Sequence, residues 1–409
     1  MTYPPMGGEY LRNWQTINIL RQLGPVAVFS ISDRALRPPE LDGVVLWQHY
    51  DTSQDRSPRS QVERFAQWVR QCGLTYYCPY RAAAARALEE TVDRFKPDLV
   101  VLEQLWLIPY LAVLQKRPCR IIYDAHNVEA PLYRATKCQG SGLRSLVRNT
   151  LHLSQIRRDE QTLTRQTSCV WACSDRDRTQ LHQRYGDTFV SAVVVNGVDP
   201  AFYRALPSDA NRELEGVETG TATLILTGNF AHLPNARAAE ILISDLYPRL
   251  KPTYPQLRLL LVGRHPTAAM QAAAGRDPNI VVTGEVPDVR PYLAIASVAI
   301  VPLQEGSGTR LKILEAFAAG CPVVSSTKGA EGLAVRDGEH LLIRDGIDAM
   351  MQGVQLLWDD PALKAQMLQS ARRCLQSDYS WESARVQAQT VLQALFSDAE
   401  YDTEKKARN

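Results

Sequence analysis

Hydrophobic residues recur along the chain in short continuous runs, many of them β-branched, and longer helical stretches separate these runs. In the first half of the chain the runs are 25–31, 43–50, 98–104, 120–127, 168–174 and 191–197. In the second half they are 222–229, 257–264, 279–286, 298–303, 321–326 and 340–345. Continuous hydrophobicity is typical of parallel strands that are buried on both faces, with helices as the connections between them. The pattern therefore predicts two doubly wound α/β domains.

The boundary between the two domains is expected near residue 200. Asn196-Gly197 and Asp199-Pro200 have turn chemistry, the stretch Ser208–Gly220 is polar and acidic, and no strand is predicted before Ala222. A helix is predicted over Trp381–Phe396, followed by a polar tail that we expect to be frayed. The predicted parts are an N-terminal domain at 1–200, a C-terminal domain at 201–380, a helix at 381–396 and a tail at 397–409.

The composition narrows the class of protein. A length of 409 residues fits two or three domains, and 45% hydrophobic with 22% charged residues excludes a disordered or collagen-like chain. No apolar stretch reaches the roughly 20 residues of a membrane span, since the nearest, Leu105–Leu114, contains Pro109. Met1–Tyr10 lacks the cationic and apolar regions of a signal peptide. We therefore expect a soluble cytoplasmic protein whose eight cysteines, with no Cys-x-x-Cys pair, are buried free thiols.

The net charge of +2 excludes nucleic acid as the main partner, but it is the sum of two unlike halves. Residues 1–200 contain 25 basic and 20 acidic residues, whereas residues 201–409 contain 21 and 24. The segment 116–165 alone contains ten basic and four acidic residues. Such a segment can hold an enzyme at the anionic inner face of the plasma membrane, near a lipid-linked acceptor. A solvated helical face remains the alternative interpretation.

Ligands of doubly wound sheets bind beyond the carboxyl ends of the strands, and two facing domains would place a cleft between two such edges. The segments that follow predicted strands are Ala125–Glu129, Gly228–Asn229, Gly263–Arg264, Gly284 and Gln304–Thr309. A ligand site is therefore expected at these five segments.

The most informative stretch is VPLQEGSGTRLKILEAFAAGCPVVSSTKGAEGL, residues 301–333. A predicted strand ends at Leu303, and the glycine-rich loop at 305–309 leads into a helix that extends to about Ala319. The N-terminus of a helix offers unpaired N–H donors to a phosphate group. Arg310 and Lys312 oppose the helix dipole there, so a nearby anion would explain their position. The alternative is an ordinary helix start with Thr309 as its cap and two solvated cations. The loop does not match a Walker A sequence.

The segment GSGTRLKILEAFAAGCPVVSSTKGAEGL resembles the donor-binding segment of family 4 glycosyltransferases, which are retaining enzymes of the GT-B fold. The variant with Gly-Thr-Arg-x-Lys is similar to the bacterial branch that takes part in exopolysaccharide assembly. Other segments resemble the family in the same order along almost the whole chain. They are 3–12, 123–130, 171–178, 193–203, 226–235, 259–266 and 282–293.

The resemblance implies a role for individual residues of this chain. Gly7-Gly8 would approach the donor diphosphate, with Arg12 in the helix that follows, and His126 would help to stabilise the transition state near the sugar. Arg310 and Lys312 would neutralise the diphosphate leaving group. Glu315 would hold the ribose hydroxyls, and the backbone near Glu285–Val286 would read the base. The predicted donor-binding residues are Gly7, Gly8, Gly228, Asn229, Gly263, Glu285, Val286, Glu305, Ser307, Gly308, Thr309 and Glu315, and the predicted catalytic residues are His126, Arg310 and Lys312.

The chain departs from the family pattern at three places. The family has a pair of glutamates separated by seven residues, and at the first position of this pair the chain has Ser307; Glu305 could substitute only if the loop bulges. The Arg/Lys pair that is usual in the first loop of the second domain is absent before Arg237, and we infer that Arg310 and Lys312 take over its role. A first strand normally precedes the glycine loop, so we expect that the true start lies upstream of Met1.

The family resemblance implies a hexosyltransferase that moves a sugar from a nucleotide-diphosphate donor to a saccharide or lipid-linked acceptor in polysaccharide biosynthesis. It also implies a C-terminal helix that crosses back to the first domain and no cofactor beyond the nucleotide sugar. We expect no metal, because the seven histidines are scattered, and Ser174 before Asp175 and Asp177 is typical of a helix N-cap. Two alternatives remain open. One is a GT-B-like nucleotide-sugar epimerase, and the other is a non-catalytic nucleotide-sugar-binding partner subunit.

Overall fold

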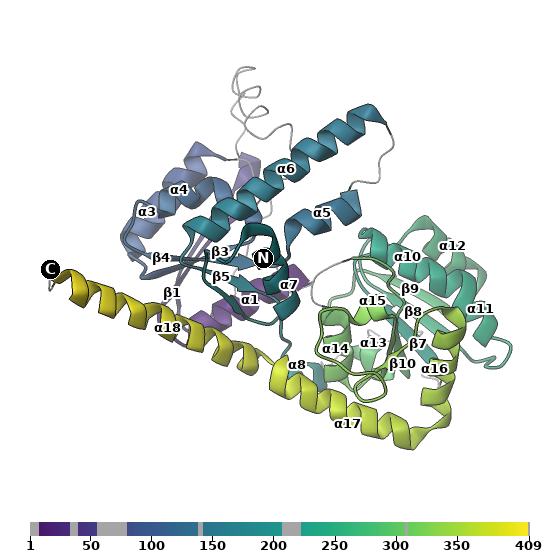
Figure 1. Ribbon diagram of the computed structural model, residues 1–409. Coiled ribbons are helices and arrows are strands. Elements are labelled where there is room, and N and C mark those ends of the chain that lie inside the picture. The colour runs from purple at the N-terminus through teal and green to yellow at the C-terminus, as the bar shows by residue number, and fades with distance from the viewer. Residues whose placement is uncertain are drawn as a thin grey trace. The chain divides into compact units, whose positions relative to one another are not determined.

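The computed structural model describes residues 8–32, 40–54, 80–137, 142–206, 222–306 and 310–407. The chain divides into two compact units, each with α-helices and parallel β-strands (Figure 1). Unit 1 comprises Met1–Val195 and Arg385–Asn409, and unit 2 comprises Asn196–Ala384. Within the described residues each of the twelve predicted apolar runs contains one strand, and every strand pair is parallel. The predicted α/β fold with parallel sheets is therefore confirmed.

Unit 1 contains a four-stranded sheet and a separate strand pair. The sheet has the order β3 (Leu99–Glu103), β4 (Arg120–Ala125), β5 (Cys169–Ala172) and β6 (Ser191–Val193). The pair consists of β1 (Val26–Ser32) and β2 (Val44–Asp51). No ladder joins the pair to the sheet among the described residues.

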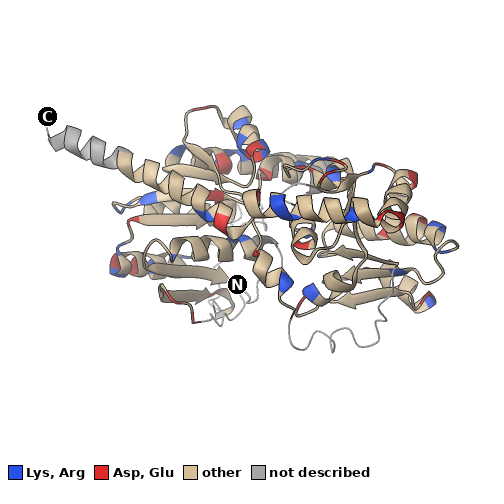
Figure 2. Cartoon of the chain, turned by 90° about the horizontal axis from the view of Figure 1, so that it is seen from below, with Lys and Arg blue, Asp and Glu red and all other residues tan. Residues whose placement is uncertain are grey.

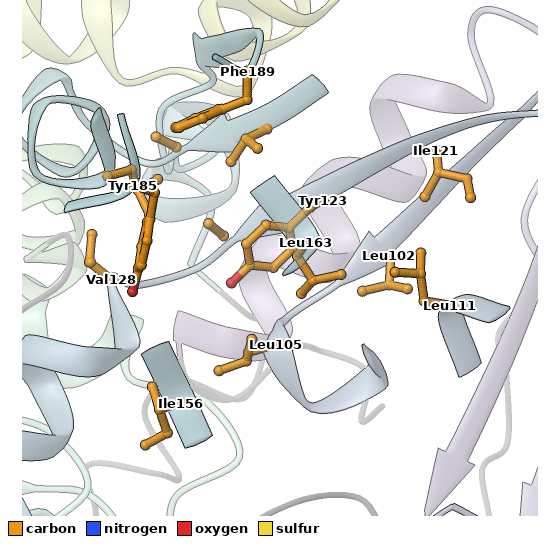
Figure 3. Packing of buried hydrophobic residues seen from close by; sticks show 14 of the residues in the cluster. Leu102, Leu105, Leu111, Ile121, Tyr123, Val128, Ile156, Leu163, Tyr185 and Phe189 are labelled. Atoms are coloured by element: carbon orange, nitrogen blue, oxygen red, sulfur yellow. The ribbon is translucent and has the colours of Figure 1, made fainter. Parts of the chain in front are cut away.

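The helices of unit 1 cover these strands. They are α1 (Gly8–Leu20), α3 (Ala82–Phe95), α4 (Leu111–Leu114), α5 (Glu129–Lys137), α6 (Leu143–Gln166) and α7 (Asp175–Tyr185), with 3-10 turns η1 (Thr52–Gln54) and η2 (Leu105–Tyr110). Figure 3 shows the core of the sheet, where Tyr123 from β4 and Leu163 from α6 lie among aliphatic side chains. Leu88 of α3 packs against this core and also against the cluster beside β1 and β2, so α3 links the two sets of strands.

Unit 2 contains a single six-stranded sheet. Its order is β12 (Leu342–Ile343), β11 (Val323–Ser325), β10 (Val298–Val301), β7 (Thr223–Thr227), β8 (Arg258–Val262) and β9 (Ile280–Gly284). The strands β7, β8, β10 and β11 are almost wholly buried, as expected for strands with continuous apolar sequence, whereas the edge strand β9 is mostly half-buried. Figure 2 shows the charged residues mainly on helices and loops. The strand order reverses between β7 and β10, where the chain begins its second series of strands on the other side of β7.

The helices of unit 2 connect these strands, and a long helix follows them. They are α8 (Pro200–Arg204), α10 (Leu233–Ile241), the π-helical turn η3 (Leu242–Leu246), α11 (Tyr247–Leu250), α12 (Ala268–Arg276), α13 (Arg290–Ile295), α14 (Leu311–Ala319), α15 (Thr327–Ala330), α16 (Ile347–Asp359) and α17 (Pro361–Asp378). The last helix, α18 (Trp381–Ala407), starts in unit 2 and ends in unit 1, where Gln387 accepts a hydrogen bond from the backbone of Val195.

The structure differs from our expectation at the C-terminus. The predicted tail after Phe396 continues the helix α18 to Ala407. Residues 397–407 contain no glycine or proline, and Glu, Lys and Ala are good helix formers, so nothing in this sequence ends the helix. The polar stretch Ser208–Gly220 lies outside the described residues.

The predictions for Ser174 and for the cysteines can be compared with the structure. The hydroxyl of Ser174 accepts a hydrogen bond from the backbone of Asp177, so this acidic pair belongs to a capped helix, as expected. The described cysteines are all free, and four of the five are buried; they are Cys119, Cys169, Cys173, Cys321 and Cys374. Within the described ranges, no helix has both the length and the apolar character that crossing a membrane requires.

Candidate functional site

The strand order of unit 2 points to a ligand site at the ends of β7 and β10. In doubly wound sheets the connections on either side of the reversal leave in opposite directions, which opens a crevice at the carboxyl ends of these two strands. Thr227 ends β7 and Val301 ends β10. The predicted residues Gly228 and Asn229 follow the first strand, and Glu305, Arg310 and Lys312 follow the second. The topology therefore brings two distant segments of the sequence to one edge.

Two of the predicted glycines are required by close packing at this edge. A side chain on Gly263, whose φ is +145°, would overlap the carbonyl oxygen of Gly228 at 1.8 Å. A side chain on Gly228 would lie 2.9 Å from the amide nitrogen of Asn235 and 3.3 Å from the Lys312 ammonium. Backbone hydrogen bonds from Gly228 to Val262 and from Gly263 to Gly284 fix the ends of β7, β8 and β9 together. Gly228 therefore leaves space that the Lys312 ammonium and Asn235 occupy, and Gly263 lets the ends of β7 and β8 come close together.

Lys312 and Arg310 form the cationic part of this edge. Lys312 Nζ donates to Asn235 Oδ1 at 2.7 Å, and Asn235 Nδ2 donates to the carbonyl of Asn229 at 2.9 Å. Arg310 is buried at the start of α14, and its Nη2 donates to the carbonyls of Gly306 and Lys328. Loss of water around the ammonium, followed by repulsion from Arg310, lowers the pKa of Lys312 to about 7.

Two like charges held together in a partly desolvated place attract an anion. The interpretation of Arg310 and Lys312 as two solvated cations is therefore wrong for Arg310, because its side chain is buried. Thr309, the expected cap, lies outside the described residues, as do Ser307 and Gly308.

Glu305 lies at the same edge but has a cationic partner. Its Oε1 is 2.5 Å from Arg237 Nη1 on α10. Gly306 follows with a φ of +108°, a conformation that glycine adopts without strain. The ion pair with Arg237 therefore connects the loop after β10 to α10. Arg237 is the first cation of this segment, and it comes after the positions of the family's usual Arg/Lys pair.

Glu315 lies on α14, one helical turn after Lys312. Its Oε1 accepts a hydrogen bond from Tyr203 Oη at 2.7 Å. Burial raises the pKa of Glu315, although Tyr203 and Lys312 act in the opposite direction. Glu285 and Val286 follow β9 at the same carboxyl edge of the sheet, and the Glu285 side chain is exposed, 4.0 Å from Arg264.

In unit 1, a buried ion pair joins α1 to the end of β4. Arg12 donates to Asp124 through Nε at 2.9 Å and through Nη2 at 2.7 Å, with both side chains almost fully buried. Arg12 Nη1 also donates to the carbonyls of Val194 and Val195. Burial raises the pKa of Asp124, but the Arg12 guanidinium outweighs this effect and holds that pKa below its usual value. The pair therefore fixes α1, which starts at Gly8, against the carboxyl edge of the sheet; Gly7 lies outside the described residues.

His126 follows β4 and has a partner at each ring nitrogen. Its Nε2 is 2.7 Å from Glu103 Oε2, and its Nδ1 is 3.2 Å from Gln104 Nε2. Gln104 has a φ of +73°, which is unusual for a residue with a side chain. Burial raises the pKa of Glu103, followed by the nearby Asp124, while His126 acts in the opposite direction. The imidazole is thus held in place by Glu103 and Gln104. The His126 carbonyl accepts a hydrogen bond from Cys173 Sγ at 3.4 Å, and its second lone pair could accept a further contact.

The same cluster contains three potential metal ligands, but each of them already has a partner in the protein. The ligand atoms of Glu103, Asp124 and His126 lie within 4.8 Å of one another. Asp124 already accepts from Nε and Nη2 of the Arg12 guanidinium, and Glu103 contacts the imidazole. A divalent cation bound by Asp124 would have to break the two hydrogen bonds between this carboxylate and the buried Arg12 guanidinium. The loss of this ion pair would have a large electrostatic cost. These residues fit a charge-paired scaffold better than a set of metal ligands.

Sequence reasoning missed several residues at these two edges. Glu103 stands at the carboxyl end of a predicted strand, so its position was a usable signal. Asn235 and Tyr203 gave no such signal, because neither follows a strand. They reach Lys312 and Glu315 only through the fold.

Two parallel α/β units in one chain, with paired cations and a carboxylate beyond the strands of the second unit, are the arrangement expected of a GT-B fold. A family model described as "Glycosyltransferase Family 4" matches residues 44–202, and one described as "Glycosyl transferases group 1" matches residues 221–360. The two matches follow one another and together span most of the chain. The chain therefore belongs to the family 4 glycosyltransferases.

The chain is similar to known proteins along most of its length. Glycogen synthase from Mycobacterium tuberculosis is 28% identical over 328 residues, which cover 76% of this chain and 73% of that protein. The structure of Anabaena HepE with UDP and glucose has a TM-score of 0.66 at 15% identity, covering 95% of this chain and 96% of that chain. Sucrose-phosphate synthase from Thermosynechococcus elongatus has a TM-score of 0.70 at 16% identity, covering 96% and 94%. These structural similarities support the GT-B fold.

Proposed function

We propose that this glycosyltransferase moves a sugar, with retention of configuration, from a nucleotide-diphosphate donor to a saccharide or lipid-linked acceptor in polysaccharide biosynthesis. The observation that carries the proposal is the pair of cations, Arg310 and Lys312, at the β7/β10 reversal of unit 2. The similarity to glycogen synthase and to a HepE structure that contains UDP and glucose supports a sugar nucleotide, with UDP as the first donor to test.

The proposed mechanism assigns the charges of the reaction to this chain's own residues. Departure of the nucleoside diphosphate leaves negative charge on the leaving group and partial positive charge on the sugar. Arg310 and Lys312 stabilise the leaving group, and Glu315 holds the ribose of the donor. His126 stabilises the sugar in the transition state through its backbone carbonyl, since Glu103 and Gln104 hold its ring nitrogens. Two side-chain cations meet the charge requirement of the leaving group, so we propose that the reaction needs no metal.

The remaining predicted donor contacts are proposals of the same kind. Gly7 and Gly8 are proposed contacts of the diphosphate from unit 1. Gly228, Asn229 and Gly263 lie beside it in unit 2, where glycine lets the ligand come close to the backbone. Glu305, Ser307, Gly308 and Thr309 line the donor sugar and phosphates, and the backbone at Glu285–Val286 reads the base.

A donor screen tests the proposed function. Purified protein is incubated with UDP-, GDP- and ADP-sugars, with and without EDTA, while ligand-observed NMR records binding and the anomeric configuration of any product. We expect one donor to bind and to be hydrolysed or transferred slowly with retention, equally well in EDTA. Binding without turnover would favour a partner subunit, and conversion of one nucleotide sugar into another would favour an epimerase.

The pKa of Lys312 predicts that donor binding depends on pH. In the free protein a pKa of about 7 leaves Lys312 mostly neutral at pH 8. A bound diphosphate favours the charged form, so binding at pH 8 should take up about one proton, and affinity should fall up to about tenfold per pH unit above 7. Calorimetry with UDP-, GDP- and ADP-sugars in buffers of different ionisation enthalpy measures this uptake. Lys312→Met should abolish it, and an unchanged proton uptake in this variant would contradict the assignment.

We further propose that α6 binds an anionic membrane surface, which would place the enzyme at the inner face of the plasma membrane. Leu146, Val147 and Leu151 are unusually exposed for aliphatic residues, at 62%, 52% and 49%. Exposed arginines accompany them on α6: Arg148, Arg157, Arg158 and Arg165. The two acidic residues of the helix are less available, since Asp159 is partly buried and Glu160 is fully buried. Apolar residues flanked by cations are typical of helices that lie in a membrane interface.

Sedimentation with vesicles tests this surface. Each cation near an anionic leaflet contributes about 1 kcal/mol, so Arg157→Ser with Arg158→Ser should weaken binding to phosphatidylserine vesicles about 30-fold. Leu146→Ser should weaken it as well, whereas Val190→Ser, also 62% exposed in unit 1, is the matched control and should not. Binding that is insensitive to salt, or equal for Leu146→Ser and Val190→Ser, would exclude the membrane role of α6.

A further inference from the structure

The short helix α8 connects two parts of the candidate donor site that are far apart in the sequence. It is the first helix of unit 2 after the chain leaves unit 1, and Asp199 and Pro200 define its start, with the Asp199 carboxylate accepting from the backbone of Ala201. α8 packs against α14, the helix that carries Lys312 and Glu315. Its position is therefore defined by contacts within unit 2.

The contact between α8 and α14 includes a buried hydrogen bond. Tyr203 is 6% exposed, and its hydroxyl donates to Glu315 Oε1 at 2.7 Å. Hydrogen bonds to an ionised carboxylate are stronger than those between neutral groups, and a carboxylate has further lone pairs available. A carboxylate with one oxygen fixed in this way is oriented, and its second oxygen remains able to accept from a diol.

Arg290 fixes the other side of α8. Its Nη1 donates to the carbonyl of Phe202 at 2.8 Å and to the carbonyl of Ala205, and its guanidinium lies 3.7 Å from the centre of the Phe202 ring. Asp288 forms an ion pair with it at 2.5 Å. Asp288 follows Glu285–Val286 in the loop after β9, which is the loop proposed to read the base, and Arg290 is the first residue of α13 at the end of that loop.

We propose that Tyr203 is a positioning residue that orients the Glu315 carboxylate toward the ribose diol, and that Arg290 connects this carboxylate to the base-reading loop through α8. The inference rests on the proposed function, since it takes the ligand to be a nucleoside diphosphate. Tyr203 itself does not touch the nucleotide. Its contribution appears only when the ribose has hydroxyl groups for Glu315 to hold.

Removal of the Tyr203 hydroxyl should therefore affect ribose recognition selectively. In Tyr203→Phe, Glu315 loses the donor that keeps it oriented and ionised, so it holds the diol less well. We expect Kd for the ribonucleotide to rise about tenfold, and Kd for the 2′,3′-dideoxy analogue to stay the same. A general structural defect would weaken both ligands equally.

Calorimetry with UDP, GDP and ADP and their 2′,3′-dideoxy forms measures this difference. Tyr247→Phe is the matched control, because Tyr247 Oη also donates to a carboxylate, Asp277, at 2.7 Å. Asp277 precedes β9, so this control bond lies at the amino end of the strand, away from the carboxyl edge. Arg290→Lys keeps a cation beside Asp288 but loses the planar fork, and we expect a smaller loss of ribose preference in the same direction.

The outcomes separate this inference from the proposed function. The inference is supported if the wild type binds the ribonucleotide more tightly than its dideoxy form, and if this preference disappears in Tyr203→Phe but persists in Tyr247→Phe. Equal ribose preference in the wild type and Tyr203→Phe would overturn it and leave the proposed function intact. If the wild type bound none of the three nucleotides, both would be wrong.

Discussion

Replacing Arg310 by alanine should lower kcat/KM for the nucleotide-sugar donor about 10²–10³-fold and leave the fold intact. A fixed donor at the place where charge develops typically contributes this much to the rate. Arg310 is 7% exposed, and its Nη2 bonds go to the backbone carbonyls of Gly306 and Lys328, which are neutral acceptors. The substitution therefore removes a positive charge at the β7/β10 reversal. Steady-state kinetics with the donor found in the screen gives the ratio, and thermal unfolding shows whether the fold persists.

Two further variants locate the effect in the charge and geometry of this side chain. Arg310→Lys keeps the charge and loses the planar donor fork, so we expect an intermediate loss. Arg276→Ala removes an exposed arginine at the end of α12, which leads into the amino end of β9, and should leave kcat/KM unchanged. If Arg310→Ala retained the wild-type kcat/KM, Arg310 would have no place in the donor site.

The fold could be predicted from the sequence because its strands are buried on both faces. Such strands must be apolar throughout, and each predicted run contains a strand in the structure. For example, β8 (Arg258–Val262) lies within the predicted run 257–264, and β10 (Val298–Val301) lies within the predicted run 298–303. The end of α18 was not predictable in the same way. A polar sequence without a helix breaker is compatible with a helix or with a frayed end, and hydrophobic patterning does not distinguish them.

The residues of the candidate site could be predicted where their position relative to a strand can be read from the sequence. Gly228 directly follows β7, and Arg310 and Lys312 lie at the start of α14, the helix that follows β10, where parallel topology places a ligand. The partners of these residues were not predictable, because each pairing spans a long separation in the sequence. Asn235 reaches Lys312 across 77 positions, and Tyr203 reaches Glu315 across 112. Only the packed fold determines which polar side chains meet, so these contacts required the structure.

Replacing Arg12 by methionine should lower the free energy of unfolding by about 3–5 kcal/mol, because it leaves the Asp124 carboxylate buried without its counter-charge. Both side chains are almost fully buried, and two hydrogen bonds of 2.9 and 2.7 Å join them. The lowered pKa of Asp124 means that the pair stabilises the fold above the unfolded pKa of about 3.9, and this stability is lost as pH falls through the folded value. Urea denaturation at pH 7 measures the loss.

The double variant Arg12→Met with Asp124→Leu decides whether the charge pair itself causes this loss. Removing both charges leaves no buried ion, so most of the stability should return, although the carbonyls of Val194 and Val195 lose a donor. A double variant as unstable as Arg12→Met would show that those backbone contacts dominate. If stability returns but transfer does not, the pair serves the reaction as well as the fold. Asp124 is the penultimate residue of β4 and lies two residues before His126, so the ion pair then fixes the strand end from which His126 acts.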